Sequence, residues 1–182
     1  LGLDGGREQA LMNEDGALEA VRSGFSIEPF VVVDGKVQGW ANVRATQSLQ
    51  DDYLPIPSVQ WQHDKLGLRV TSFVQGRAEQ AQLIARYRLH NPDKVAHDYR
   101  LALAVRPFQV NPPRQFLSTP GGISRIERLA FNGGTVSVNG QPRVFALVQP
   151  DAAFASAFDS KLDVTHLADK NLPGLQASAS TA

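Results

Sequence analysis

A short stretch near the middle of this sequence carries the side chains best suited to contact a polar partner. It brings together two guanidinium groups, an aromatic ring and three amides, at Arg106, Phe108, Gln109, Asn111, Arg114 and Gln115. Guanidinium and amide groups hydrogen-bond in fixed directions, and the ring adds a flat apolar surface. Pro112 and Pro113 stiffen the segment, so less conformational entropy is lost when it meets a partner. The pattern predicts a surface that docks on another domain or contacts a ligand.

Three aromatic residues form a second set of candidates, because a sugar ring can stack on a flat aromatic face. Trp40, Tyr53 and Trp61, with the amides of Gln109 and Asn111, have the chemistry of a sugar site. Both tryptophans also lie within strand patterns, so packing in the core is the competing interpretation. Exposure separates the two, since only a solvent-facing tryptophan beside polar groups supports sugar binding.

Residues with metal-binding or nucleophilic chemistry are present, but their spacing matches no metal or catalytic motif. The four histidines are His63, His90, His97 and His166, and there is no cysteine. His63 and His97 stand beside turn residues, which favours a solvated imidazole over a metal ligand. The sequence also has no G-x-S-x-G elbow and no P-loop. It therefore predicts no catalytic residue, no metal site and no cofactor.

Glu28 is the acidic residue in the most apolar context, F-S-I-E-P-F. A lone buried charge is very costly, so an inward-facing Glu28 needs a cationic partner. Arg44, Arg88 and Arg106 are the candidates. Such a structural ion pair is favoured over a catalytic role.

The composition of the chain argues against several classes of protein. The chain has 182 residues, with 18 Lys and Arg balanced by 18 Asp and Glu, so it lacks the positive charge expected of a partner for nucleic acid or an anionic membrane. The absence of cysteine excludes disulfides and thiol chemistry. No apolar run reaches the length of a membrane span. The chain begins without Met, and we expect it to be a piece of a longer polypeptide.

The sequence predicts that the elements that position these residues are strands. Residues 66–75, 80–90 and 100–106 alternate between apolar and polar side chains, as strands with one face on a core do. Asp34-Gly35 and Asn139-Gly140 predict tight hairpins within 30–46 and 136–148. We predict an all-β, two-layer antiparallel β-sandwich with at most short helices. It covers residues 1–161, and residues 162–182 form a C-terminal tail or linker.

Four segments of the sequence are distinctive, namely R-S-G-F-S-I-E-P-F at 22–30, Y-L-P-I-P-S-V-Q-W at 53–61, L-A-V-R-P-F-Q-V-N-P-P at 103–113 and G-G-I-S-R-I at 121–126. Together they resemble the β-supersandwich region of large bacterial proteins predicted to be glycosidases. The likeness covers about residues 10–170. In that family the region precedes an α/α toroid of six helical hairpins, often with an attached discoidin-type domain. The resemblance implies that the catalytic acid and base lie in the toroid, and no catalytic residue maps onto this sequence.

The leading hypothesis is therefore a non-catalytic β-sandwich domain of a larger carbohydrate-active protein. It would dock on the neighbouring catalytic domain of the same polypeptide and shape its cleft through residues 106–115. The alternative is an independent carbohydrate-binding module with an aromatic stacking platform. A third hypothesis is a sugar epimerase, which needs a histidine and a carboxylate that converge on one concave face. The resemblance favours a location outside the cytoplasm, either periplasmic or secreted.

Overall fold

The structure is a computed structural model that describes residues 1–21, 24–110, 122–157, 163–169 and 178–180. It confirms the predicted all-β class, since the described elements are antiparallel strands and short 3-10 helices. The chain divides into two compact units, Leu1–Ser124 and Arg125–Ala182. The division falls inside the range 1–161 that the sequence assigned to one sandwich. In the described part of the chain no helix has the length and hydropathy to cross a bilayer.

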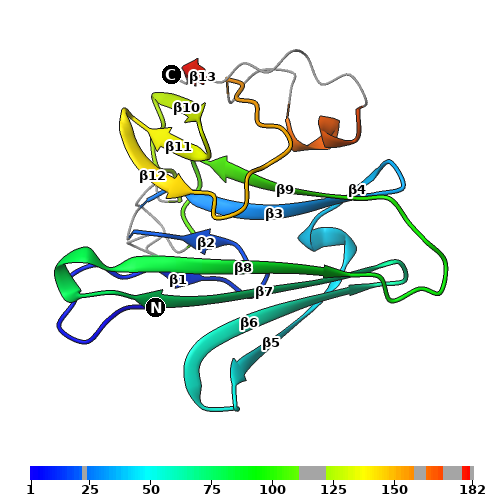
Figure 1. Cartoon of the computed structure of the whole chain (residues 1–182), viewed down its shortest axis with the longest axis horizontal. Coiled ribbons are helices and arrows are strands. Elements are labelled where there is room, and N and C mark those ends of the chain that lie inside the picture. Colours follow the sequence, from blue (N-terminus) through cyan, green and yellow to red (C-terminus); the bar gives the residue numbers. More distant parts are fainter. Residues whose placement is uncertain (22–23, 111–121, 158–162, 170–177, 181–182) are drawn as a thin grey trace. The chain divides into compact units, whose positions relative to one another are not determined.

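The first unit contains two antiparallel sheets. Sheet A consists of β1 (Leu11–Met12), β2 (Leu18–Glu19), β3 (Ser26–Val33), β4 (Lys36–Gln38) and β9 (Tyr99–Arg106). Its central strand β3 pairs with β9 along its whole length, as Figure 1 shows. The other edge of β3 is shared by β2 and β4, and β1 extends the sheet beyond β2. Sheet A thus joins both ends of the first unit's sequence.

Sheet B is formed by four strands that follow one another in the chain. They are β5 (Arg44–Gln50), β6 (Leu54–His63), β7 (Leu66–Gln75) and β8 (Gln82–His90), with the 3-10 helices η1 (Trp40–Asn42) before β5 and η2 (Ala78–Gln80) before β8. Each strand pairs antiparallel with the next. β7 has the bounds that its alternating pattern predicted. The β5–β6 hairpin curves away from β7 towards its tip (Figure 1).

The two sheets pack face to face, as predicted for a two-layer sandwich. Val31 and Val33 of sheet A join a buried cluster with five residues of sheet B, namely Val59, Trp61, Leu66, Leu68 and Val70. Tyr87 and Tyr99 pack against this cluster from β8 and β9. The alternate side chains of sheet B face away from the core, because side chains of a strand point to opposite sides in turn.

The predicted turn at Asp34-Gly35 is confirmed, but the predicted return strand is wrong. Both turn residues have positive φ, 49° and 78°, as a type I′ hairpin requires. The strand expected over 37–46 ends at Gln38, and η1 interrupts it. At Gly39 an added Cβ would lie 3.3 Å from Phe30 Cε1. The chain leaves sheet A for sheet B after this close approach, and Trp40 lies on η1, outside any strand.

Two further differences have simple physical reasons. Pro55 and Pro57 lie inside β6, although proline usually interrupts a strand. They are tolerated because that half of β6 pairs with β5 alone. Leu101 and Leu103 are exposed although their alternation predicted a core-facing side. Among the described residues β9 pairs only with β3, so this edge strand is incompletely covered.

The second unit contains a separate antiparallel sheet. It comprises β10 (Arg128–Asn132), β11 (Thr135–Val138), β12 (Gln141–Phe145) and β13 (Ser178–Ser180), together with the 3-10 helix η3 (Val164–Ala168). The predicted turn at Asn139-Gly140 is present, with φ of 52° and 78°. The predicted tail 162–182 contributes η3 and β13, and β13 pairs with β10.

Candidate functional site

A cleft of about 210 Å³ in the first unit brings the two sets of candidates together. Phe108 and Gln109 line it, as predicted for the docking set, and so do Trp40 and Trp61 from the aromatic set. The turn between β1 and β2 supplies Asn13, Asp15 and Ala17, β3 supplies Ser26, Glu28 and Pro29, and Val110 completes the lining. The cleft therefore combines flat apolar rings with carboxylate and amide groups.

The two tryptophans have different roles. Trp61 is 1% exposed and belongs to the core, as its strand pattern predicted. Its Nε1 donates a 2.8 Å hydrogen bond to the Asp15 carbonyl oxygen, which fixes the floor of the cleft. Trp40 is 57% exposed on η1, so the interpretation that it packs in the core is wrong. Trp40 is the aromatic side chain in this cleft that presents most of its surface to solvent.

The carboxylate of Glu28 is occupied on both oxygens. Arg106 Nη1 donates to Oε2 at 3.0 Å, and the Ser26 hydroxyl donates to Oε1 at 2.7 Å. The prediction that Glu28 needs an arginine partner is confirmed, with Arg106 chosen from the three candidates. The Glu28 side chain is 14% exposed and that of Arg106 is 29% exposed. This arrangement favours a structural role for Glu28 at the wall of the cleft.

Residues 106–110 are tied closely to the rest of the first unit. The guanidinium carbon of Arg106 lies 4.5 Å from the centre of the Phe108 ring, which is a cation–π contact. Gln109 makes two hydrogen bonds with the Gly122 backbone, one from its own N–H and one to its Oε1. The Val110 N–H donates to Oε2 of the buried Glu19 at 2.8 Å. The start of the predicted docking segment is therefore a well-anchored wall of the cleft.

The remaining predicted residues lie elsewhere. Asn111, Arg114 and Gln115 fall outside the described residues. Tyr53 is exposed in the tip of the β5–β6 hairpin and does not line the cleft. The proposed platform of Trp40, Tyr53 and Trp61 is thus divided among the cleft, the hairpin tip and the core.

Asp15 is the site residue that the sequence analysis missed. It lies in the first 24 residues, where glycines interrupt any regular pattern of apolar and polar side chains. Burial raises the pKa of the Asp15 carboxyl, and the neighbouring Glu14 adds to the rise. Asn13 holds this turn, since its Oδ1 accepts hydrogen bonds from the backbone N–H of Asp15 and Ala17. The N-D-G spacing of residues 13, 15 and 16 is the turn signal that precedes the site.

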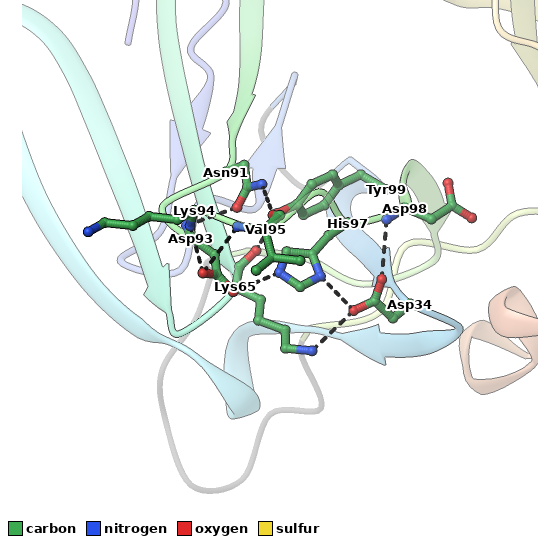
Figure 2. Close-up of polar contacts among 9 residues, drawn as sticks. All are labelled: Asp34, Lys65, Asn91, Asp93, Lys94, Val95, His97, Asp98 and Tyr99. Carbon is green, nitrogen blue, oxygen red and sulfur yellow. Dashed lines mark hydrogen bonds and ion pairs between the residues drawn. The ribbon is translucent and has the colours of Figure 1, made fainter.

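A second polar cluster surrounds His97 in the link between β8 and β9. Its Nδ1 lies 2.8 Å from Asp34 Oδ2, and its Nε2 lies 2.8 Å from Asp93 Oδ2. Figure 2 shows the ring between these two carboxylates, with Lys65 Nζ 3.2 Å from Asp34. The His97 side chain is 6% exposed, so the solvated interpretation is wrong for His97, whereas His63 is exposed as predicted. Because Asp34 and Lys65 belong to hairpin turns of different sheets, this cluster joins sheet A to sheet B.

The electrostatics of this cluster follow from its hydrogen bonds. The bond to Asp93 raises the pKa of His97 above its usual value, and the bond to Asp34 adds to the rise. The pKa of Asp93 is lowered, chiefly by His97. The pKa of Asp34 is lowered first by the backbone N–H of Asp98 and then by Lys65. These shifts favour the charged forms of the imidazole and of the two carboxylates, as expected for a structural contact.

The described residues contain no group of three or more histidine, aspartate or glutamate side chains arranged to hold a metal ion. Both ring nitrogens of His97 are bound by carboxylates, and Glu28 is held by Arg106. His97 and Glu28 therefore belong to separate clusters and do not form the converging pair that the epimerase hypothesis needs. A comparison of the chain with family models finds no match, and comparisons with curated proteins and with solved structures find none either.

Proposed function

We propose that this chain is a non-catalytic β-sandwich domain of a carbohydrate-active protein and that its Trp40 cleft binds sugar. The exposed Trp40 ring at a cleft with polar walls carries this proposal. One face of the indole offers a stacking surface to a sugar ring. The Asp15 carboxyl lines the same cleft and can hydrogen-bond sugar hydroxyls. The all-β fold and the resemblance to a glycosidase-associated sandwich support the same class of ligand.

The engagement of Glu28 supports binding over catalysis. Glycoside hydrolysis needs two carboxyl groups that are available to the scissile bond. Glu28 is held by Arg106 and Ser26. Asp15 is the other acidic residue of the cleft, and its carboxyl group forms no ion pair within the described residues. A single available carboxyl suits a hydrogen bond to a bound sugar.

Binding of the isolated chain to a glycan array, followed by calorimetric titration of the best oligosaccharide, tests this proposal. We expect Trp40→Ala to weaken binding about tenfold, because stacking and apolar burial of the indole together contribute about 1.4 kcal/mol. Tyr53→Ala is the matched control, since it removes another exposed ring outside the cleft. Equal affinity of the Trp40→Ala variant and the unaltered chain, or an array without any bound glycan, would rule the proposal out.

Docking on a neighbouring catalytic domain is the second candidate function. The exposed Leu101 and Leu103 on β9 favour it, since apolar side chains on an edge strand gain free energy when a partner covers them. Changing both leucines to Ser in the full-length polypeptide should lower its thermal stability and leave that of the isolated domain unchanged. An equal effect on both would argue for a role within the domain alone.

A further inference from the structure

The outer face of sheet B, on the side away from the core, carries ordered rows of polar side chains. In one row Ser58 of β6 lies opposite Thr71 of β7, which lies opposite Arg86 of β8. In the next row the residues are Gln60, Arg69 and Arg88. Hydroxyl and amide groups thus stand beside guanidinium groups across three adjacent strands. We call these six residues the arginine face.

The arginine side chains of the arginine face, Arg69, Arg86 and Arg88, form no ion pair within the described residues. Arg69 and Arg88 are direct cross-strand partners, and like charges in such pairs repel each other. An anionic ligand would remove this repulsion. The domain therefore keeps an unfavourable arrangement that a bound anion would convert into a favourable one.

Hydrogen bonds hold part of this face in place before any ligand arrives. Arg69 Nε donates to Gln60 Oε1 at 3.0 Å, and Gln60 Nε2 donates to the Trp61 carbonyl at 3.1 Å. The hydroxyls of Ser58 and Thr71 lie 2.7 Å apart. A guanidinium that is oriented in advance loses less entropy when it binds.

All residues of the arginine face except Gln60 line a cleft of about 390 Å³. Its wall is the curved β5–β6 hairpin, through Ser48, Leu49, Gln50 and Asp51. The β5–β6 pairing shifts between Leu49 and Gln50, and Asp51 has a φ of 52°. Such irregular pairing bends a strand. The bend gives the outer face the concavity that an extended chain can occupy.

We propose that the arginine face binds a carboxylate-bearing polysaccharide, at a site separate from the Trp40 cleft. Guanidinium groups match carboxylates through paired hydrogen bonds, and the Ser and Thr rows match sugar hydroxyls. A protein partner would need a central apolar anchor, and a nucleic acid would need stacking rings. Among the described residues that line this cleft, Leu49 is the one apolar side chain, it lies in the wall and not in the centre of the face, and there is no aromatic ring. This inference goes beyond the first proposal because it names a second site and a charged ligand.

Calorimetric titration of the 182-residue chain with polygalacturonate tests the inference, at an ionic strength of about 0.15 M where weak surface attraction is screened. We expect Arg69→Gln and Arg86→Gln each to weaken binding about tenfold or more, the effect of losing one charge-assisted hydrogen bond. Arg7→Gln removes the same charge from an exposed loop outside the face and should bind as the unaltered chain does. Thermal unfolding of each variant shows that the fold is retained.

Two further ligands separate carboxylate recognition from simple attraction between charges. Fully methyl-esterified polygalacturonate keeps the sugar chain without its charge, and we expect it not to bind. Dextran sulfate carries charge of another kind, and we expect it to bind more weakly than polygalacturonate. The inference would be overturned if polygalacturonate did not bind, or if its methyl ester bound equally well. It would also be overturned if dextran sulfate bound more tightly, or if Arg7→Gln lost as much affinity as the variants of the arginine face. Trp40→Ala should leave this binding unchanged, which separates it from the first proposal.

Discussion

Arg106 Nη1 lies 3.0 Å from Glu28 Oε2, although the two residues are 78 positions apart in the chain. The pair bridges β9 and β3, where Ala104 is the direct partner of Glu28 and Arg106 is the direct partner of Ser26. Glu28 therefore reaches diagonally across the strands to its guanidinium, and Ser26 supports it from the same strand. This contact fixes the start of the segment that forms one wall of the Trp40 cleft.

Breaking this pair should destabilise the first unit. We expect Arg106→Ala to lower the free energy of unfolding by roughly 1–2 kcal/mol, less than for a fully buried pair because both side chains keep some exposure. A double-mutant cycle with Glu28→Gln, measured by urea unfolding, should give a coupling of about 1 kcal/mol. The exposed pair Arg125–Glu127 is the control, with an expected coupling close to zero. Equal couplings for the two pairs would contradict the structural role.

The His97 cluster should make stability depend on pH. Because the pKa of His97 is raised in the folded state, its contribution is complete below its unfolded pKa of about 6.5 and is lost as pH rises through the higher folded value. Because the pKa values of Asp34 and Asp93 are lowered, their contributions are present above about pH 4 and are lost as pH falls through the lower folded values. The cluster therefore stabilises the fold most in mildly acidic solution.

Urea unfolding midpoints measured from about pH 5 to about pH 9 test this effect, because histidine titrates in roughly this range. The midpoint of the unaltered chain should fall as pH rises, and His97→Gln should remove most of that slope. His63→Gln replaces an exposed histidine and should retain it. Parallel curves for the unaltered chain and His97→Gln would show that the cluster does not couple protonation to folding.

Tyr87 offers a stabilising substitution. Its Oη is buried, and no hydrogen-bond partner for it exists within the described residues. Burial raises the pKa of the Tyr87 hydroxyl, which keeps it neutral. Since a buried hydroxyl without a partner costs free energy, we expect Tyr87→Phe to raise the free energy of unfolding by about 1 kcal/mol. Tyr99→Phe is the contrasting variant, because the Tyr99 hydroxyl donates to the Lys65 carbonyl and its loss should destabilise. A loss of stability in Tyr87→Phe would contradict this account.

Local chemistry predicted much of the fold. Asp34-Gly35 and Asn139-Gly140 adopt the positive φ angles that tight turns require, and β7 follows its alternating pattern from Leu66 to Gln75. Each of these signals acts between neighbouring residues. The exposure of Leu103 was not predictable in this way, because alternation defines the two faces of a strand without showing whether a second sheet covers them.

The candidate site was predicted in part. The need of Glu28 for an arginine followed from the cost of a buried charge, and the structure provides Arg106. Trp40 was expected in a strand, but β4 ends at Gln38 and Trp40 lies on η1, next to the close approach of Gly39 to Phe30. Asp15 joins the cleft through the β1–β2 turn, whose strands are two residues each. Such short strands have too few residues to show a period.

The pairing of β3 with β9 also affects the order in which the protein acquires its structure. All of sheet B lies between these two strands in the chain, and each of its hairpins closes a short loop, whereas β3 and β9 must close a long one. We therefore expect the β5–β8 meander to form first during refolding and β9 to join afterwards. In pulsed amide exchange, β7 amides should gain protection before those of β9, and the reverse order would refute this sequence of events.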